Sequence, residues 1–304
     1  MKKPLAFDPS TGIDLHLHST ASDGTLTPAE IIKEAVRIGL KAIAITDHDT
    51  LAGSSAAFSS GIPPSLQFLS GVEISAAAPE GFQVKGSVHI LGYGIAFDNP
   101  KLNAILEVLK HSRESRNPKI IKRLNALGMR LNDEELMAIV GDGMAGRPHI
   151  AQLMIKKGIV ASVDEAFDRY LGKNKPAYVG KYRVPMKETI EAIKDAGGVA
   201  VLAHPFLYGL NDSTTFEAFL DTLTSMGLKG IEAIYPDHDQ EIADWYCNLA
   251  RTHNLLISGG TDFHGNVTPH LKMGSGIGDF HVPYNYFEKL IKAISRDSNG
   301  RFTA

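Results

Sequence analysis

Two pairs of residues of metal-binding type stand near opposite ends of the chain, each after a short apolar run. His16 and His18 form the first pair, and Asp262 and His264 form the second. Side chains two positions apart on a strand point to the same face, so each pair would present two ligands in one direction. One such pair often arises by chance. Two pairs after strand-like runs indicate a site for more than one metal ion.

Other apolar runs also end in, or contain, residues that can bind metal ions. Polar residues at the carboxyl ends of strands are typical of a (β/α) barrel, whose active site lies on that face. The residues that extend the candidate ligand set are Asp23, His48, Glu73, His89 and His204. Mixed imidazole and carboxylate ligands favour zinc, manganese or iron, whereas oxygen ligands alone favour magnesium or calcium.

Several of these candidates have an ordinary structural alternative, and His204 could simply end its strand before Pro205. His89 lies within an apolar stretch and could be a hydrogen-bonded core histidine. Asp23 could be an ordinary turn residue without a metal ligand role. Glu73 could form a salt bridge, because a carboxylate after an apolar run is costly unless it is paired or bound to metal.

Composition limits the classes of protein that the chain can form. Its 304 residues can form one barrel with an insertion. The net charge of −3 excludes a global basic field for nucleic acid. The single Cys247 excludes a disulfide framework and fits a reducing compartment. No apolar stretch is long enough for a membrane span or a signal sequence, so we expect a cytoplasmic protein without a membrane partner.

The order of predicted elements indicates a barrel with an insertion. Strand and helix patterns alternate up to about Phe97 and resume late in the chain, whereas the stretch between them contains only helical patterns. Thr27 is the expected N-cap of a helix over 28–38. We therefore predict an α/β barrel formed by 1–98 and 172–304, with a helical insertion at 99–171 that caps the active site.

At these residues the chain resembles the PHP (polymerase and histidinol phosphatase) superfamily. The matching segments are 14–19, 22–25, 45–50, 71–75, 202–205 and 260–264. The resemblance implies a distorted (β/α)7 barrel that holds two or three divalent metal ions, with manganese expected first and zinc or iron as alternatives. It assigns His16, His18, Glu73 and Asp262 to one ion, Glu73, His89 and His204 to a second, and Asp23, His48 and His264 to a third. Many members carry His where Asp23 stands.

The predicted insertion resembles one branch of this superfamily. Segments 146–151, 170–171 and 175–179 are similar to nucleoside 3′,5′-bisphosphate phosphatases and RNase AM-type 5′-3′ exoribonucleases. The resemblance implies a phosphorylated small molecule or nucleotide as substrate, or a short RNA, with no obligate protein partner.

A cluster of divalent ions would lower the pKa of bound water toward ~7 and neutralise charge on phosphoryl oxygens. No Ser or Cys nucleophile is then required. The general acid stays open among Asp47, Asp49 and His238.

Substrate recognition is expected from the insertion and the loop after it. Arg147 is the first candidate, because guanidinium binds phosphate in a bidentate manner. His149, Lys175, Tyr178 and Arg183 could line the same pocket, or these basic residues could form a solvated loop. A second basic run, from Lys110 to Arg123, is expected on a solvated helix face.

Three classes of function compete. The first is a metal-dependent phosphoesterase acting on nucleotides or short 5′-phosphorylated oligoribonucleotides, with a histidinol-phosphate-type phosphatase as a variant. The second is a C–N amidohydrolase, since those barrels also begin with His-x-His. The third is a non-catalytic metal-binding PHP module.

Overall fold

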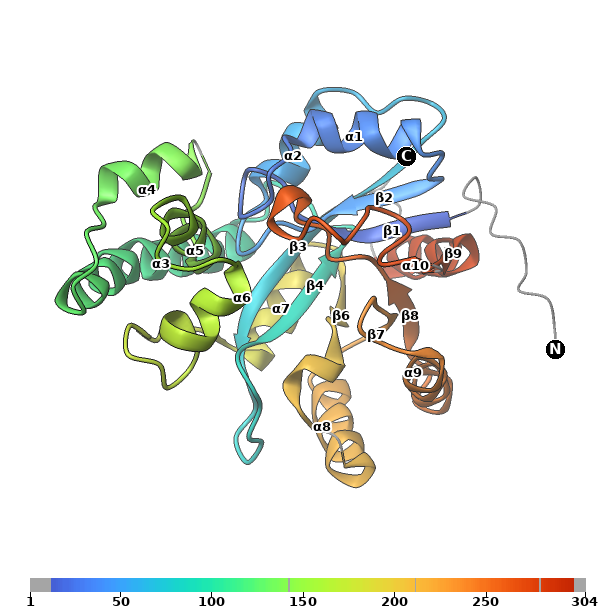
Figure 1. Cartoon of the computed structure of the whole chain (residues 1–304). Coiled ribbons are helices and arrows are strands. Elements are labelled where there is room, and N and C mark those ends of the chain that lie inside the picture. Colours follow the sequence, from blue (N-terminus) through green and yellow to red (C-terminus); the bar gives the residue numbers. More distant parts are fainter. Residues whose placement is uncertain (1–11, 142, 211, 279, 298–304) are drawn as a thin grey trace, which may run out of the picture.

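The computed structural model describes residues 12–141, 143–210, 212–278 and 280–297, so the ends of the predicted barrel range, 1–11 and 298–304, lie outside it. A mixed sheet forms its centre (Figure 1). Seven strands have at least four residues: β1 (Gly12–Leu17), β2 (Ala42–Ile45), β3 (Gln67–Ala77), β4 (Val88–Tyr93), β6 (Val199–Leu202), β7 (Gly230–Ile234) and β8 (Leu256–Gly259). The two-residue strands β5 (Val184–Pro185) and β9 (Val282–Pro283) pair with β3 and β1.

The sheet curves until its two sides nearly meet. Its strand order is β8-β7-β6-β4-β3-β2-β1-β9. Beyond the end of β8, Phe263 forms a bridge with Leu17 of β1, and the N–H of His18 donates to the carbonyl of Phe263 at 3.0 Å. The distortion comes from β4, which runs antiparallel to both β3 and β6. The predicted α/β class with a distorted seven-stranded barrel is thus confirmed.

Strand β3 changes partner along its length. Residues 67–70 pair with β2, and residues 71–76 pair with β4. Gly71 lies at the change, where a Cβ atom would come within 2.9 Å of the Ile45 carbonyl oxygen. Glycine therefore lets the strand pass close to β2 as it bends toward β4.

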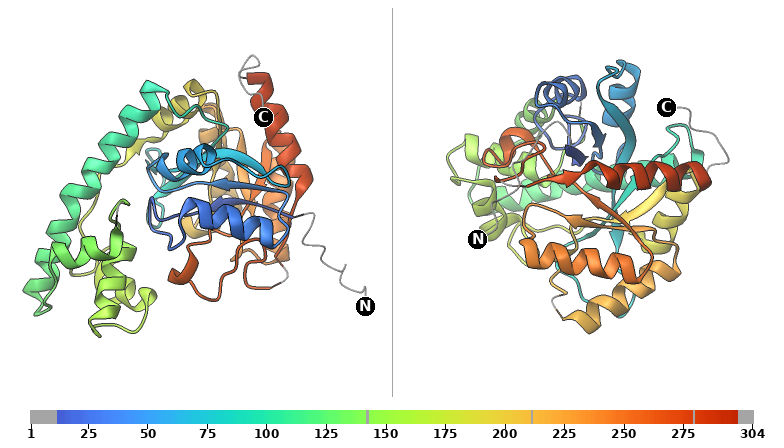
Figure 2. Two further views of the ribbon diagram at one scale, coloured as in Figure 1. Left: turned by 90° about the horizontal axis from the view of Figure 1, so that it is seen from above. Right: turned by 90° about the vertical axis from the view of Figure 1, so that its right-hand side faces the viewer.

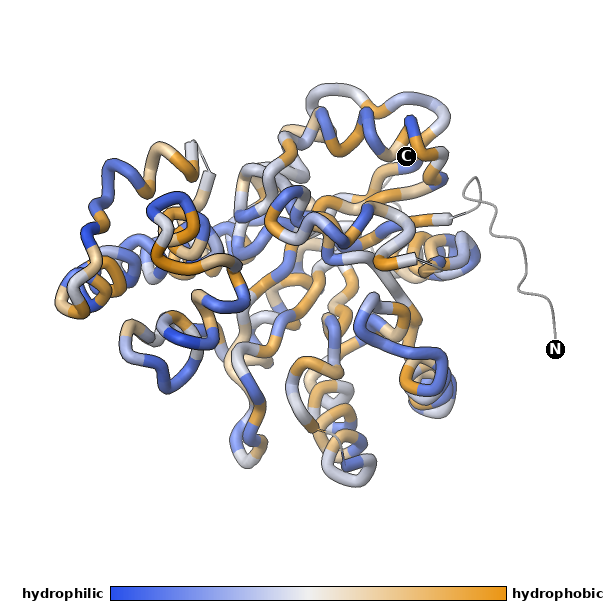
Figure 3. The backbone as a smooth tube through the Cα atoms, viewed as in Figure 1, coloured by the Kyte–Doolittle hydropathy of each residue, from blue (hydrophilic) through white to orange (hydrophobic). Residues whose placement is uncertain are grey.

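Six helices surround the strands (Figures 1 and 2). They are α1 (Pro28–Arg37), α2 (Ala52–Ser59), α7 (Met186–Asp195), α8 (Ser213–Ser225), α9 (Gln240–Thr252) and α10 (Tyr284–Asp297). Thr27 caps α1 in a capping box with Glu30, as expected. Hydrophobic residues concentrate along the strands (Figure 3), where they fill the space between sheet and helices. No helix in the described part of the chain has the length and hydrophobicity needed to span a membrane.

The stretch 99–171 is helical, as its periodicity predicts. It contains α3 (Pro100–Ala126), α4 (Asp133–Val140), α5 (Arg147–Lys156), α6 (Val163–Ala166) and a π-helical turn (Phe167–Leu171). In Figure 2 (left), α3 runs from the barrel out to the smaller helices. Its first half packs Leu102 and Leu109 into the barrel core, and its second half packs Ile120 and Leu124 into a separate core shared with α4 and α5.

A buried ionic cluster joins this helical stretch to the barrel. The Asp49 carboxylate accepts from Arg113 Nε and Nη2 of α3 at 2.8 and 2.6 Å, and from Lys181 Nζ at 2.8 Å. It also accepts from the Ser75 backbone N–H at 2.7 Å. Arg113 and Arg116 are only 7% and 4% exposed, so their expected place on a solvated helix face is wrong. Their three-residue spacing turns both toward the barrel instead.

We expect Asp49→Asn to destabilise the protein strongly. Asn tolerates the positive φ of 57° at this position, so the substitution removes mainly the negative charge. The buried Arg113 then loses its counter-charge, a change that typically costs about 3–5 kcal/mol. Urea unfolding at pH 7 measures the difference in the free energy of unfolding.

Glu34→Gln is the matched control, because Glu34 pairs with Arg37 on the exposed side of α1. Exposed ion pairs contribute little, so its unfolding midpoint should stay almost unchanged. Equal unfolding curves for the two variants would contradict the structural role of Asp49.

Candidate metal centre and its surroundings

The nine predicted ligands lie in one cluster at one edge of the sheet. His16 lies near the end of β1 and His18 directly follows that strand, Glu73 lies within β3, and His204 follows β6. His89 stands near the start of β4, which reaches the same edge because β4 runs against its neighbours. Loops that follow β1, β2 and β8 bring the other four, which are Asp23, His48, Asp262 and His264.

Potential ligand atoms converge in three overlapping groups, each with all its atoms within 4.8 Å of one another. In the group that includes both His16 and His18, His18 Nε2 lies 3.0 Å from Asp262 Oδ1, and His16 Nε2 lies 3.5 Å from Glu73 Oε2. The groups are His16, His18, Glu73 and Asp262; His48, Glu73 and His89; and His18, Asp23, His48 and His264.

Glu73 occupies the centre of the cluster. His89 Nδ1 and His204 Nε2 lie 2.8 and 2.9 Å from its Oε1 atom, and His48 Nδ1 lies 2.7 Å from its Oε2 atom. His48 is thus within reach of two groups, whereas the family pattern gives it only to the third ion.

The donor set fits divalent cations. Buried nitrogen and oxygen atoms of the cluster lack a hydrogen-bond partner among the described residues, although several lie at ion-pair distance from one another. They include His16 Nε2, His18 Nε2, Asp23 Oδ1, His48 Nδ1, Glu73 Oε2 and Asp262 Oδ1. Unsatisfied buried polar atoms are costly, and a bound cation would satisfy them together.

The carboxylates of the cluster are ionised. Burial alone would raise the pKa of Glu73, but His48, His89 and His16 outweigh it and hold that pKa well below its usual range. Burial opposes protonation of His18, yet Asp262 and Glu73 raise its pKa to about 10. Metal ligation requires ionised carboxylates and neutral histidines, so a bound cation would take the place of the proton on His18.

Two acidic residues that the sequence analysis did not select support the predicted ligands. Glu232 is fully buried, with Oε1 2.9 Å from His16 Nδ1 and Oε2 accepting from the His204 N–H at 2.7 Å. Asp14 accepts from the N–H and hydroxyl of Thr261, which ties β1 to the loop that carries Asp262. Their signal in the sequence is an acidic residue inside an apolar strand.

The three candidates for the general acid have different surroundings. Asp47 accepts from the Ser19 N–H and hydroxyl at 2.8 and 2.7 Å and from the Ser22 hydroxyl at 2.6 Å. Asp49 belongs to the ionic cluster with Arg113 and Lys181. His238 packs its ring against other aromatic rings and belongs to none of the three ligand groups found among the described residues.

Arg147 lies at the start of α5 between two aromatic rings. Its guanidinium carbon is 5.2 Å from the centre of the Phe167 ring and 5.5 Å from that of Tyr178, and Nη1 donates to the Leu171 carbonyl at 3.0 Å. Arg183 Nε donates to the Ser87 hydroxyl, and Lys175 is exposed.

His149 stabilises the start of α5, and Arg116 adds positive charge near Arg147. His149 Nδ1 accepts from the Gly146 N–H at 3.0 Å. Arg116 donates to Asn117 Oδ1 and has no carboxylate partner among the described residues. Burial, together with the neighbouring Arg113 and Arg147, lowers the pKa of Arg116 to about 9.

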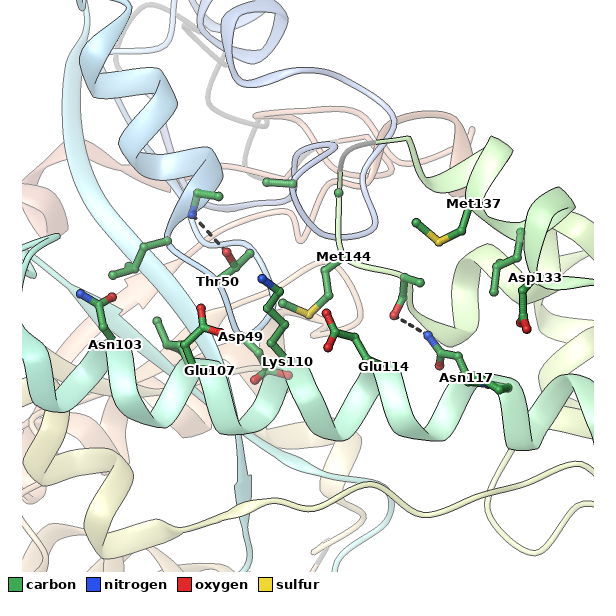
Figure 4. Close-up of a pocket in the computed structure, with 18 residues that line it drawn as sticks. Asp49, Thr50, Asn103, Glu107, Lys110, Glu114, Asn117, Asp133, Met137 and Met144 are labelled. Carbon is green, nitrogen blue, oxygen red and sulfur yellow. Dashed lines mark hydrogen bonds between the residues drawn. The ribbon is translucent and has the colours of Figure 1, made fainter.

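A separate cleft of about 590 Å³ lies between α3, α4 and the loop before α2 (Figure 4). Four acidic residues, Asp49, Glu107, Glu114 and Asp133, line it together with Lys110. Their negative charge disfavours phosphate in this cleft.

Residues 14–176 match the sequence model of the PHP domain. The chain belongs to the PHP domain family. It is similar to a 5′-3′ exoribonuclease of Haemophilus influenzae, with 34% identity over 83% of this chain and 89% of that protein. It is also similar to a 3′,5′-nucleoside bisphosphate phosphatase of Chromobacterium violaceum, with 32% identity over 83% of this chain and 87% of that protein.

A crystal structure of a Bifidobacterium adolescentis protein described as a metal-dependent phosphoesterase has the same fold. Its TM-score is 0.81 at 28% identity, and the match covers 95% of this chain and 97% of that chain. This PHP protein is accordingly a hydrolase of phosphoric esters.

We expect Glu73→Gln to lose more metal and more activity than Asp23→Ala. Glu73 is shared by two of the ligand groups, whereas Asp23 belongs to one. Manganese bound per chain, measured after reconstitution and dialysis, checks this order, and circular dichroism verifies that both variants are folded. Equal losses of manganese in the two variants would contradict the shared position of Glu73.

Proposed function

We propose that this PHP protein releases phosphate from nucleotides that carry two phosphates, above all nucleoside 3′,5′-bisphosphates. Short 5′-phosphorylated oligoribonucleotides, shortened from the 5′ end, are proposed as further substrates. The observation that carries this proposal is an excess of positive charge around Asp49, the residue that follows the predicted ligand His48. The cations are Arg113, Arg116, Arg147, Lys181 and Arg183, and among the described residues only Asp49 forms ion pairs with any of them.

Two of these cations, Arg113 and Lys181, are tied by Asp49 to the neighbourhood of the predicted metal ligands. Asp49 follows His48 in the chain, and Lys181 donates to the hydroxyl of Ser75, two residues after Glu73. Burial and the charge of Arg113 lower the pKa of Lys181 to about 7 even though Asp49 opposes this change. Buried cations in excess favour an anionic ligand, because an uncompensated buried charge is costly.

We propose that the predicted metal ligands and the neighbouring arginines each bind one of the two phosphates of a bisphosphate. The predicted ligands would hold the phosphate that is cleaved, with two or three divalent ions and manganese as the first choice. When bound, such ions lower the pKa of water and neutralise charge on the phosphoryl oxygens. The arginines would hold the second phosphate through planar N–H pairs, as guanidinium does for phosphate elsewhere.

The helical stretch 99–171 is proposed to cap the site. It carries three of the five cations, Arg113, Arg116 and Arg147, and one of them, Arg113, pairs with Asp49 of the barrel. The barrel would thus supply the reaction centre, and the cap would select substrates that have a second phosphate.

Two assays, both with manganese added, test the proposed function. They measure release of inorganic phosphate from adenosine 3′,5′-bisphosphate and from histidinol phosphate, and release of nucleotides from a 5′-phosphorylated trinucleotide. We expect kcat/KM for adenosine 3′,5′-bisphosphate to exceed that for histidinol phosphate by at least about tenfold, the value of one charge-assisted contact. A 5′-phosphorylated trinucleotide should also be cleaved. A preference for histidinol phosphate would favour the histidinol-phosphate-type phosphatase, and hydrolysis of amides alone would favour an amidohydrolase.

Arg147→Ala should raise KM for adenosine 3′,5′-bisphosphate while kcat changes little. A contact with the phosphate that is not cleaved is made equally in the ground and transition states. Its loss should weaken binding by roughly 1.5–3 kcal/mol, about ten- to a hundredfold. Steady-state kinetics with p-nitrophenyl phosphate, which has no second phosphate, should be nearly unchanged.

Arg169→Ala is the matched control, since Arg169 also lies over an aromatic ring, that of Tyr170, but is exposed. It should behave like the parent protein on both substrates. Equal losses on both substrates in Arg147→Ala would instead assign Arg147 to the support of the fold through Leu171.

A further inference from the structure

Glu232 is a buried carboxylate that connects two of the predicted ligands. It lies in the middle of β7 with 0% exposure. Its Oε1 atom is 2.9 Å from His16 Nδ1, and its Oε2 atom accepts from the His204 backbone N–H at 2.7 Å. Both oxygens are therefore engaged, each with a residue that the family pattern gives to a different metal ion.

The contact with His16 determines which ring nitrogen is available for metal. Ionised carboxylates only accept hydrogen bonds, so the Nδ1 atom beside Glu232 carries the proton. The opposite nitrogen, Nε2, lies 3.5 Å from Glu73 Oε2 and 3.3 Å from Asp262 Oδ1, within the first ligand group. A histidine held in this way keeps its Nε2 lone pair free and aimed at the cluster.

The contact with His204 fixes the backbone of a strained residue. His204 has φ 22° and ψ 62°, a conformation that side-chain-bearing residues rarely adopt, and Pro205 follows it. The hydrogen bond to Glu232 anchors this turn at the end of β6. The anchored turn brings His204 Nε2 to 2.9 Å from Glu73 Oε1. Strain of this kind persists only where surrounding contacts hold it.

We propose that Glu232 is a positioning residue for two metal sites at once. It sets the ring of His16 for the first site and the backbone of His204 for the second. This inference rests on the proposed metal ligation by His16 and His204, and it does not depend on which phosphoester is the substrate.

Glu232→Gln tests the proposal because glutamine has nearly the same shape as glutamate. One of its two terminal groups, however, is an NH2 donor and not an accepting oxygen. If the amide oxygen faces His16, the amide NH2 group meets the His204 N–H, donor against donor. If the oxygen faces His204, the NH2 group donates to His16 Nδ1 and moves the ring proton to Nε2, the nitrogen that should bind metal. Either orientation disturbs one of the two sites.

The measurements are the affinity for manganese, from competition with a chelator, and the visible spectrum of bound cobalt(II), which reports the ligands directly. We expect Glu232→Gln to bind metal about 10- to 100-fold more weakly, as loss of supporting partners of ligands typically does. Its cobalt spectrum should differ from that of the parent protein. Ser258→Ala is the matched control, because Ser258 is the buried register partner of Glu232 on β8 and should leave both readings unchanged.

Glu232→Asp keeps the charge, but its side chain is one methylene shorter. This variant tests the positioning role of Glu232 if Glu232→Gln does not fold. It should also weaken metal binding, since the shorter side chain cannot keep both contacts. Parent-like affinity and spectrum in a folded variant would overturn the proposal. Loss of metal in Glu232→Gln, in a parent protein that does not cleave adenosine 3′,5′-bisphosphate, would support Glu232 and overturn only the proposed substrate.

Discussion

The interaction on which the rest of the structure depends is the gathering of histidines around one buried carboxylate. Glu73 has 0% exposure, and histidines from β1, β4 and the ends of β2 and β6 approach it. A buried negative charge is tolerated only with compensating partners, so each of these strands must end at a definite position around it. The reversed β4 and the bend of β3 at Gly71 both follow from this requirement, because they bring His89 and Glu73 to the same edge.

The loops at this edge of the sheet contain residues with unusual backbone conformations. Asp49, His204 and Asp262 all have positive φ values, and all three stand just beyond the end of a strand. Side-chain networks hold them: Arg113 and Lys181 bind Asp49, and Glu232 binds His204. Two of the predicted ligands, His204 and Asp262, thus have a backbone conformation that surrounding contacts must hold, as is common at functional sites.

Much of this arrangement can be predicted from the sequence. Histidines at fixed spacing after apolar runs predict the cluster, and helical periodicity places α3, α4 and α5 within a few residues. The direction of β4 could not be predicted, since an apolar run does not reveal whether its strand runs parallel or antiparallel to its neighbours. The burial of Arg113 and Arg116 was missed because basic residues at helical spacing normally face solvent. Glu232 gave a signal, an acidic residue within an apolar strand, but its partners lie far away in the chain.

The two halves of the site have opposite electrostatic requirements. The barrel edge presents ionised carboxylates and buried unsatisfied atoms, which favour cations. The helices of the stretch 99–171, with the loop at Lys181, present more positive charge than Asp49 can neutralise, which favours anions. A divalent metal ion together with a phosphorylated substrate would satisfy both at once. Since Asp49 pairs with Arg113 of α3 and directly follows His48, one residue couples the placement of α3 to the geometry of the metal-binding edge.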